Sequence, residues 1–129
     1  MPRNYYPLIK ISLSKHDEDV LDMILGSSPK ELPVVVTEAT PREVEAVKLA
    51  EEGKIDEAID SITRLIETYP ANPSLYNNRA QMYRLVGRDD DARKDLERCL
   101  NHCTQPAHDA IKMQALVQMG WLDFKQRGE

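Results

Sequence analysis

The sequence predicts an all-α protein of about two and a half helix–turn–helix repeats, stacked as an α-solenoid behind an N-terminal docking helix. Three observations lead to this fold class. The middle of the chain matches itself after a shift of 34 residues. Apolar residues recur there at helical spacing, and glycine and proline separate the apolar segments. Because one such repeat cannot bury its apolar face alone, neighbouring repeats are expected to stack.

The repeat consists of residues of the same class that lie 34 positions apart. Two antiparallel helices approach closely only where their side chains are small, so alanines are expected at the contact and large apolar residues beside it. Gly53 and Gly87 are expected to end the first helix of each pair in a left-handed conformation. The matched pairs are Ala46–Ala80, Leu49–Tyr83, Gly53–Gly87, Ala58–Ala92, Ile62–Leu96 and Ile66–Leu100.

Helix starts and stops follow from local signals. Thr40 is expected to cap the first repeat helix, with Pro41 at its first position and Glu43 completing a capping box. Acidic residues 89–91 are expected to cap a later helix and complement its dipole. Prolines mark the loops between repeats. The expected helices are 41–52, 56–69, 74–86, 90–103 and 107–127.

The chain divides into an N-terminal region and a repeat domain. Residues 1–38 hold a tail, a short helix at about 14–25 and a linker. Ser14 can cap that helix, which is expected to dock on the first repeat and cover its open end. The repeat domain, 39–129, comprises repeat 1 (39–72), repeat 2 (73–106) and a partial repeat 3 (107–129).

The third repeat has one helix instead of two. Gly120 is expected to take the place of Ala80, at a spacing of 40 residues instead of 34. An unfinished repeat leaves an apolar face that could pair with a second copy, so a homodimer is the structural alternative to a binding module. A concentration-independent monomer mass would count against it. Trp121 and Phe124 are expected either to fill the last repeat interface or to form a docking patch.

The composition excludes several classes of partner. The net charge is −5 with no Lys/Arg run, whereas nucleic acid and anionic membranes require a basic patch. Apolar stretches such as 32–36 are far shorter than a membrane span, and no secretory signal is recognisable. Two cysteines are too few for a disulfide framework, so a reduced, cytoplasmic protein is expected.

No motif predicts catalysis or a cofactor. The chain has no Gly-rich phosphate loop, no HExxH and no recognisable Ser–His–Asp signature. Cys99 and Cys103 share a helix face with histidines nearby, which raises a metal hypothesis. Cys99, however, matches Leu65 in the repeat, and cysteine packs as a small hydrophobic residue. A core role is therefore favoured, and we expect neither enzyme activity nor a bound metal.

Three stretches, residues 17–25, 75–81 and 87–98, carry a family resemblance. Together with the segment 118–120 they are similar to the tetratricopeptide repeat protein 36 family, over roughly residues 14–128. The resemblance implies an adaptor or co-chaperone-like protein, a heat-shock chaperone of the seventy-kilodalton class as partner, and a link to tyrosine breakdown. The chain departs from the family in lacking the second helix of the last repeat and a counterpart for its first ten residues.

Stacked helical repeats usually bind partners on a concave face formed by the first helix of each pair. Some tetratricopeptide repeats hold the C-terminal carboxylates of chaperones there, through two Asn and three basic residues. Here only Asn78 matches that carboxylate clamp. Glu43 replaces the first Lys, Val47 the first Asn, and Gln114 and Gln118 the last two cations. A chaperone contact is therefore expected to avoid the clamp.

For Asn78 and its neighbour Arg79, a structural role is the alternative to partner binding. Asn78 is expected to hydrogen-bond between adjacent helices, and Arg79 to pair with nearby acidic residues. The residues predicted for partner binding on the concave face are Asn77, Asn78, Gln81, Arg84, Gln114, Gln118 and Trp121.

Overall fold

The computed structural model describes residues 37–127, so the expected 14–25 helix lies outside the described residues. The described part confirms the all-α prediction, and the observed helices start within one or two residues of the expected positions. They are α2 (Thr40–Glu51), α3 (Ile55–Thr68), α4 (Pro73–Leu85), α5 (Asp89–His102), the 3-10 helix η4 (Pro106–His108) and α6 (Asp109–Arg127).

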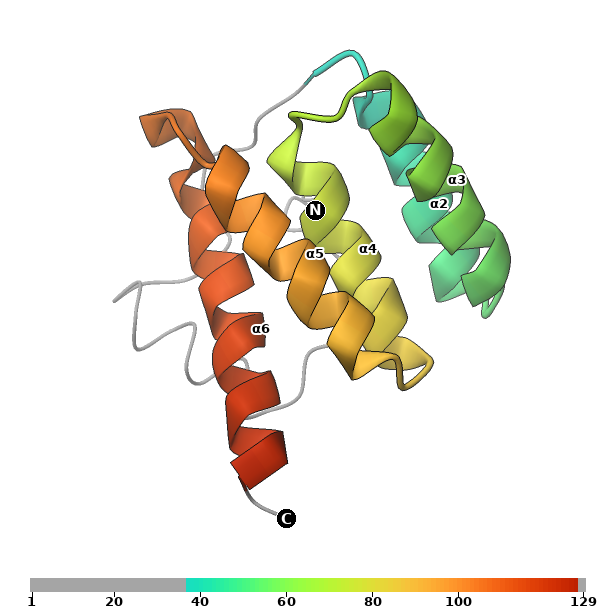
Figure 1. Ribbon diagram of the computed structural model, residues 1–129. Coiled ribbons are helices and arrows are strands. Elements are labelled where there is room, and N and C mark those ends of the chain that lie inside the picture. Colours follow the sequence, from blue (N-terminus) through green and yellow to red (C-terminus); the bar gives the residue numbers. More distant parts are fainter. Residues whose placement is uncertain (1–36, 128–129) are drawn as a thin grey trace, which may run out of the picture.

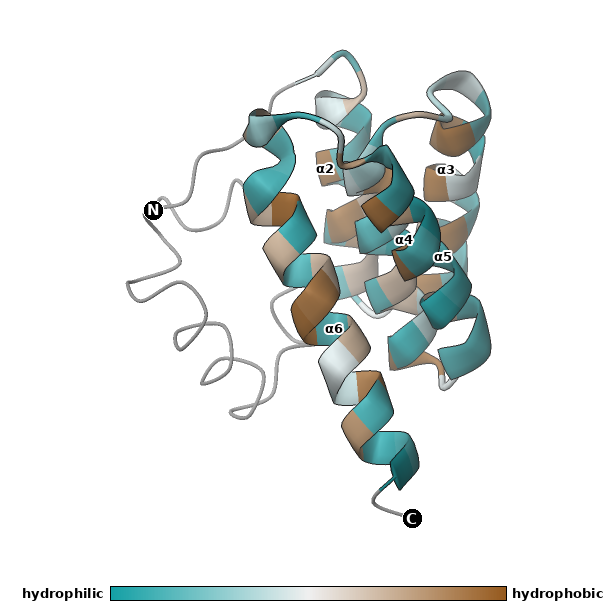
Figure 2. Cartoon of the chain, turned by 60° about the vertical axis from the view of Figure 1, so that its left-hand side comes forward, coloured by the Kyte–Doolittle hydropathy of each residue, from teal (hydrophilic) through white to brown (hydrophobic). Residues whose placement is uncertain are grey.

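The helices form two layers. Figure 1 shows the pairs α2–α3 and α4–α5 side by side, with α6 packed on the second pair. The first helix of each pair contacts the first helix of the next, α2 with α4 and α4 with α6, so these three share one layer. In Figure 1, α6 lies at one side of the molecule and the α2–α3 pair at the other, and Figure 2 shows α6 from the side that faces away from α3.

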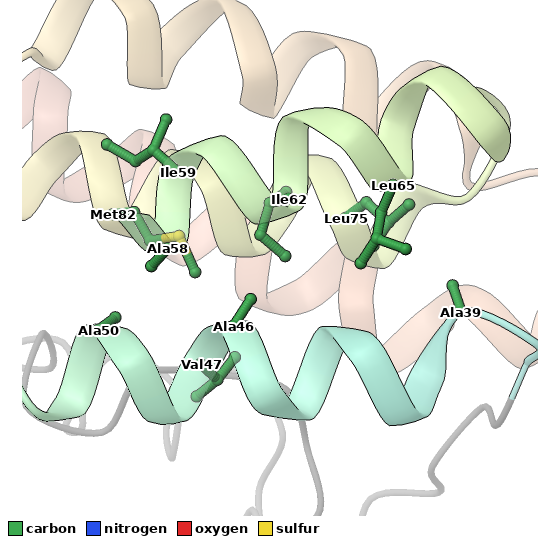
Figure 3. Close-up of a cluster of buried hydrophobic side chains, with 10 residues drawn as sticks. All are labelled: Ala39, Ala46, Val47, Ala50, Ala58, Ile59, Ile62, Leu65, Leu75 and Met82. Atoms are coloured by element: carbon green, nitrogen blue, oxygen red, sulfur yellow. The ribbon is translucent and has the colours of Figure 1, made fainter. Parts of the chain in front are cut away.

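One apolar cluster joins α2, α3 and the next repeat. Ala46 and Ala50 of α2 face Ala58 and Ile62 of α3, and all four side chains are buried (Figure 3). Small residues lie where the two helix backbones come closest, as the repeat pattern predicts. Helix α4 extends the same cluster, so the first and second repeats share a core. The other buried members are Ala39, Val47, Ile59, Leu65, Leu75 and Met82.

A second cluster joins α4, α5 and α6. Ala80 and Ala92 are fully buried in it, and so is Cys99, which confirms the core role expected for that cysteine. On α6 the small buried residue is Ala115, whereas Gly120 is exposed and a Cβ added there would meet nothing within 4 Å. The expected equivalence of Gly120 and Ala80 is therefore wrong among the described residues, because α6 packs on α4 and α5 in a different register.

Glycine ends the first helix of each pair, as predicted. Gly53 has a φ of 89° and Gly87 a φ of 79°, in the left-handed region that other residues disfavour. The amide that follows each glycine donates a hydrogen bond to a carbonyl in the last turn of the helix. Lys54 N donates to Leu49 O at 2.9 Å, and Arg88 N donates to Tyr83 O at 2.8 Å. These bonds satisfy the last carbonyls of the helix and reverse the chain.

The capping box predicted for the first repeat helix is wrong. Thr40 is already inside α2, and the N-cap is Ala39, which makes no side-chain cap bond. The Thr40 hydroxyl oxygen instead accepts a hydrogen bond from the Thr37 amide at 2.8 Å. Glu43 is 1% exposed and bonds to α4. Because the Glu43 carboxyl group is buried between α2 and α4, it does not cap the start of α2.

Acidic residues 89–91 fill the first turn of α5, where they complement the helix dipole as expected. The capping part of that prediction is wrong, because Arg88 is the N-cap and no side-chain cap bond forms. Asp89 Oδ2 instead accepts a hydrogen bond from Lys125 Nζ of α6 at 2.9 Å.

We expect Ala80→Leu to destabilise the fold by about 1–3 kcal/mol, because the added side chain must enter a fully packed helix contact. Ala107→Leu, at an exposed position of η4, makes the same chemical change and should stay within about 0.5 kcal/mol of the parent. Urea unfolding followed by circular dichroism measures both. Equal stabilities for the two variants would contradict the close-contact role of Ala80.

Candidate functional site

Most of the residues predicted for the concave face meet between α4 and α6. Asn77 lies at the centre: its Nδ2 donates to Gln114 Oε1 at 3.3 Å, and its Oδ1 accepts from Gln118 Nε2 at 2.7 Å. Arg84 Nη1 donates to Gln118 Oε1 at 3.1 Å. The three amides are buried. These side chains therefore form a polar network that ties the second repeat to α6.

Arg84 and Trp121 form the more accessible end of this network. The Arg84 guanidinium lies 4.3 Å from the centre of the Trp121 ring, and Lys125 Nζ lies 4.9 Å from it. Both Arg84 and Trp121 are half-buried, and Trp121 packs against the second apolar cluster. Phe124, in contrast, is 59% exposed. Of the two aromatic residues, Trp121 takes the interface role.

Asn78 belongs to a second polar group, between α2 and α4. Its Nδ2 donates to Glu43 Oε2 at 2.7 Å, and the Ser74 hydroxyl donates to the same oxygen at 2.5 Å. Glu43, Asn78 and Ser74 are all buried. The prediction that Asn78 bonds between adjacent helices is confirmed. Gln81, the remaining predicted residue, is fully buried on the same helix.

Within residues 37–127, the buried carboxyl group of Glu43 has no cationic partner. Among the described residues, none of the ion pairs includes Glu43. Burial raises the pKa of Glu43 from 4.5 to about 7, and the hydrogen bonds from Ser74 and Asn78 limit the rise. Desolvation disfavours the charged form of an acid, which explains the direction. Near neutral pH the group is thus poised between its two charge states.

A pocket of about 430 Å³ opens beside Glu43. The starts of α2, α4 and α6 line it, together with the loops that precede α4 and α6. Glu38 and Glu43 are its acidic residues, Tyr69 supplies a ring, and Ser74 and His108 supply further polar groups. The pocket is the place where all three first helices present side chains to one opening.

Most of this pocket does not follow from the sequence. Ser74 and His108 are 34 residues apart and come together only when the repeats stack. The Thr-Pro-x-Glu pattern predicts a capping role for Glu43, because it indicates a helix start from local sequence alone. The repeat shift of 34 offered one signal, since it places Glu43 at the same level as Asn77.

Arg79 lies outside the binding face and forms a buried ion pair. Its Nε and Nη2 donate to Asp95 at 2.7 and 2.8 Å, which joins α4 to α5. Nη1 donates to Thr63 of α3 at 3.1 Å. The side chain of Asp95 is fully buried and that of Arg79 is 12% exposed. The structural role expected for Arg79 is confirmed.

The cysteine pair does not form a metal centre with its neighbours in the described part of the chain, where no group of three or more suitable ligands occurs. Cys99 and Cys103 are free thiols. A hydrogen bond to Cys103 and burial raise the pKa of Cys99, while the same bond lowers that of Cys103. His102 stacks on Tyr76, with ring centres 5.5 Å apart.

Comparison with known proteins identifies the repeat class. Tetratricopeptide repeat protein 36 of Caenorhabditis elegans is 49% identical over 59 residues, covering 46% of this chain and 33% of the relative. The Danio rerio protein of the same name is 36% identical over 90 residues, covering 70% and 47%. A homologue from Nematostella vectensis is 34% identical over 107 residues, covering 70% and 59%. This chain is a tetratricopeptide repeat protein.

The resemblance to tetratricopeptide repeat protein 36 is thereby confirmed. The chain spans less than two thirds of the length of these relatives. No family model and no solved structure matches the sequence. Within residues 37–127, no helix is both long and apolar enough to cross a membrane.

The five positions of the tetratricopeptide carboxylate clamp hold buried or mutually bonded side chains in this structure. Glu43, in the place of the first Lys, is buried between α2 and α4, and Val47 is buried in the apolar core. Asn78, the one matching residue, donates to Glu43. Gln114 and Gln118 bond to Asn77. The side chains at the five clamp positions therefore provide no cation for a carboxylate.

The raised pKa of Glu43 predicts how stability depends on pH. Between pH 4.5 and 7 the folded chain holds a proton on Glu43 that the unfolded chain has released, so stability falls as pH rises through this window. The loss should reach on the order of 3 kcal/mol above pH 7. Glu43→Gln removes it: the variant should match the parent near pH 4.5 and be more stable at pH 8.

Glu45→Gln, on the exposed side of the same helix, removes the same charge and is the control. Its stability should follow the parent at every pH. Chemical unfolding of the three proteins between pH 4.5 and 8 measures the difference. A Glu43→Gln variant that runs parallel to the parent across this range would show that Glu43 titrates normally.

Proposed function

We propose that this tetratricopeptide repeat protein is a protein-binding module of adaptor or co-chaperone type, acting in the cytoplasm without catalysis. Stacked first helices support this proposal, since such repeats present a continuous surface to partners. The pocket at the starts of α2, α4 and α6 supplies an opening on that surface. The half-buried Arg84 and Trp121 add an aromatic and cationic end.

We further propose that the partner is a heat-shock chaperone of the seventy-kilodalton class, held away from its C-terminal carboxylates. The family resemblance suggests the chaperone, and one observation supports contact away from its C-terminus: a buried carboxyl group, that of Glu43, stands where the clamp needs a lysine. An anionic peptide end placed there would meet a like charge in a low-dielectric environment, which costs several kcal/mol. The link to tyrosine breakdown, which the family resemblance implies, stays a prediction.

Calorimetric titration tests this proposal with three ligands: the whole chaperone, the chaperone lacking its C-terminal peptide, and the isolated peptide. We expect the first two to bind with similar affinity and the peptide to give no heat of binding. The truncated chaperone is the matched control, because it differs from the whole only in the group that the clamp would hold.

Two results would contradict the proposal in different ways. Binding to the isolated peptide, or loss of binding on truncation, would show that a carboxylate site exists despite Glu43. Silence with all three ligands would exclude the chaperone as a direct partner of this chain.

Self-association through α6 is the second candidate. Figure 2 shows apolar residues along the visible side of α6 at the edge of the molecule. Leu116 is 40% exposed, and the exposed Gly120 leaves room for a close approach by another helix. The dependence of molar mass on concentration separates this candidate from the monomeric adaptor.

A further inference from the structure

The pocket at the starts of the three first helices has an acidic lining. Glu38 is exposed at the described end of the chain, and Glu43 contributes a buried carboxylate. None of the described residues that line the pocket is a lysine or an arginine. A charge as deeply buried as that of Glu43 is costly unless a counter-ion accompanies it. The pocket therefore favours a positively charged group.

Helix starts usually favour anions, because their free N–H groups carry partial positive charge. Here the first amides already have partners. Ser74 N donates to the Asn72 side chain at 3.1 Å, and Ala39 N donates to the Thr37 hydroxyl at 3.2 Å. The starts of α2 and α4 thus have fewer donors to offer an anion, while the lining holds two acidic side chains, of which Glu43 is partly ionised near neutral pH.

Two buried polar atoms in this region have no hydrogen-bond partner within the described residues. Asn78, which is fully buried and is not among the lining residues, donates from Nδ2 to Glu43, while its Oδ1 has no partner in residues 37–127. His108, in the lining, has a buried Nδ1 without one. Buried polar atoms are nearly always hydrogen-bonded, and His108 Nδ1 can accept from a bound donor when the imidazole carries its proton on Nε2. An ammonium or guanidinium group brings several N–H donors and the opposite charge.

We propose that this pocket binds the basic side chain, lysine or arginine, of a segment of a protein partner, with Glu43 as the anionic group that receives it. The proposal rests on the protein-binding function above and gives that function a chemical preference. The Tyr69 ring in the lining provides an apolar and π surface for the aliphatic stem and charged head of such a side chain. This charge preference is opposite to that of the carboxylate clamp, in which cationic side chains bind an anionic peptide end.

The test is a titration of the ¹⁵N-labelled full chain with the peptide Ac-Ala-Ala-Lys-Ala-Ala-NH2, followed by amide chemical shifts at pH 7.5. The same peptide with Nε-acetyl-lysine has nearly the same shape but no charge. We expect saturable shifts of the Asn72, Ser74 and Leu75 amides with the lysine peptide. Acetylation should weaken binding about tenfold.

Glu43→Gln keeps an oxygen that can accept from Ser74 and Asn78, so the fold should persist, and its affinity for the lysine peptide should fall about tenfold. Glu45→Gln makes the same change in net charge on an exposed position and should leave affinity unchanged. The acetylated peptide tests the parent chain alone, so the result does not depend on the folding of a variant.

Equal binding of the two peptides, or equal loss in the two variants, would overturn the proposal, because either result would reflect general attraction to an acidic protein. Shifts confined to residues away from the pocket would overturn it as well. Since the chaperone takes no part in this titration, a failure here leaves the chaperone proposal standing, and the reverse also holds.

Discussion

The close contact between helices at alanine residues is the constraint on which the rest of the structure depends. Ala46 with Ala58, and Ala80 with Ala92, let the paired helices approach at the centre of each repeat. That contact fixes the position of each first helix relative to its neighbour, and so brings α2, α4 and α6 into one layer. Every polar group on the facing sides of that layer must then find a partner within it.

Two groups of polar side chains supply most of these partners. Between α4 and α6, the amide side chains of Asn77, Gln114 and Gln118 bond to one another, and Arg84 donates to this group from its more accessible end. Between α2 and α4 the group is a carboxylate, and its two donors are neutral. The first arrangement holds repeats together. The second leaves the Glu43 carboxyl group without a cation among the described residues, next to the pocket at the helix starts. A cationic ligand could balance its charge there.

The elements that the sequence predicts well are those set by short-range order and by the repeat period. The left-handed glycines, Gly53 and Gly87, and the four buried alanines follow from a shift of 34 residues. The role of Glu43 does not, because a local capping pattern competes with a tertiary contact to α4 that sequence spacing does not reveal. The register of α6 is missed for a similar reason: helix–helix packing selects Ala115 over Gly120.

The predicted binding residues show the same division. Helical spacing correctly groups Asn77, Gln114 and Gln118 on facing sides of α4 and α6, yet it does not indicate that they bond to each other. The pocket depends on two interrepeat loops and on residues from three helices. Its composition becomes visible only after the repeats are stacked, since no contiguous segment carries it.

In the part of the chain that the structure describes, Glu43 is a buried carboxyl group without a counter-ion. Its side-chain carboxyl carbon, followed by ¹³C NMR from pH 4 to 9 in the full chain, reports its titration directly. The structure predicts a midpoint near pH 7, well above the ordinary value of 4.5. A midpoint at or below the ordinary value would show that Glu43 is solvated or already paired with a cation, and would contradict the account.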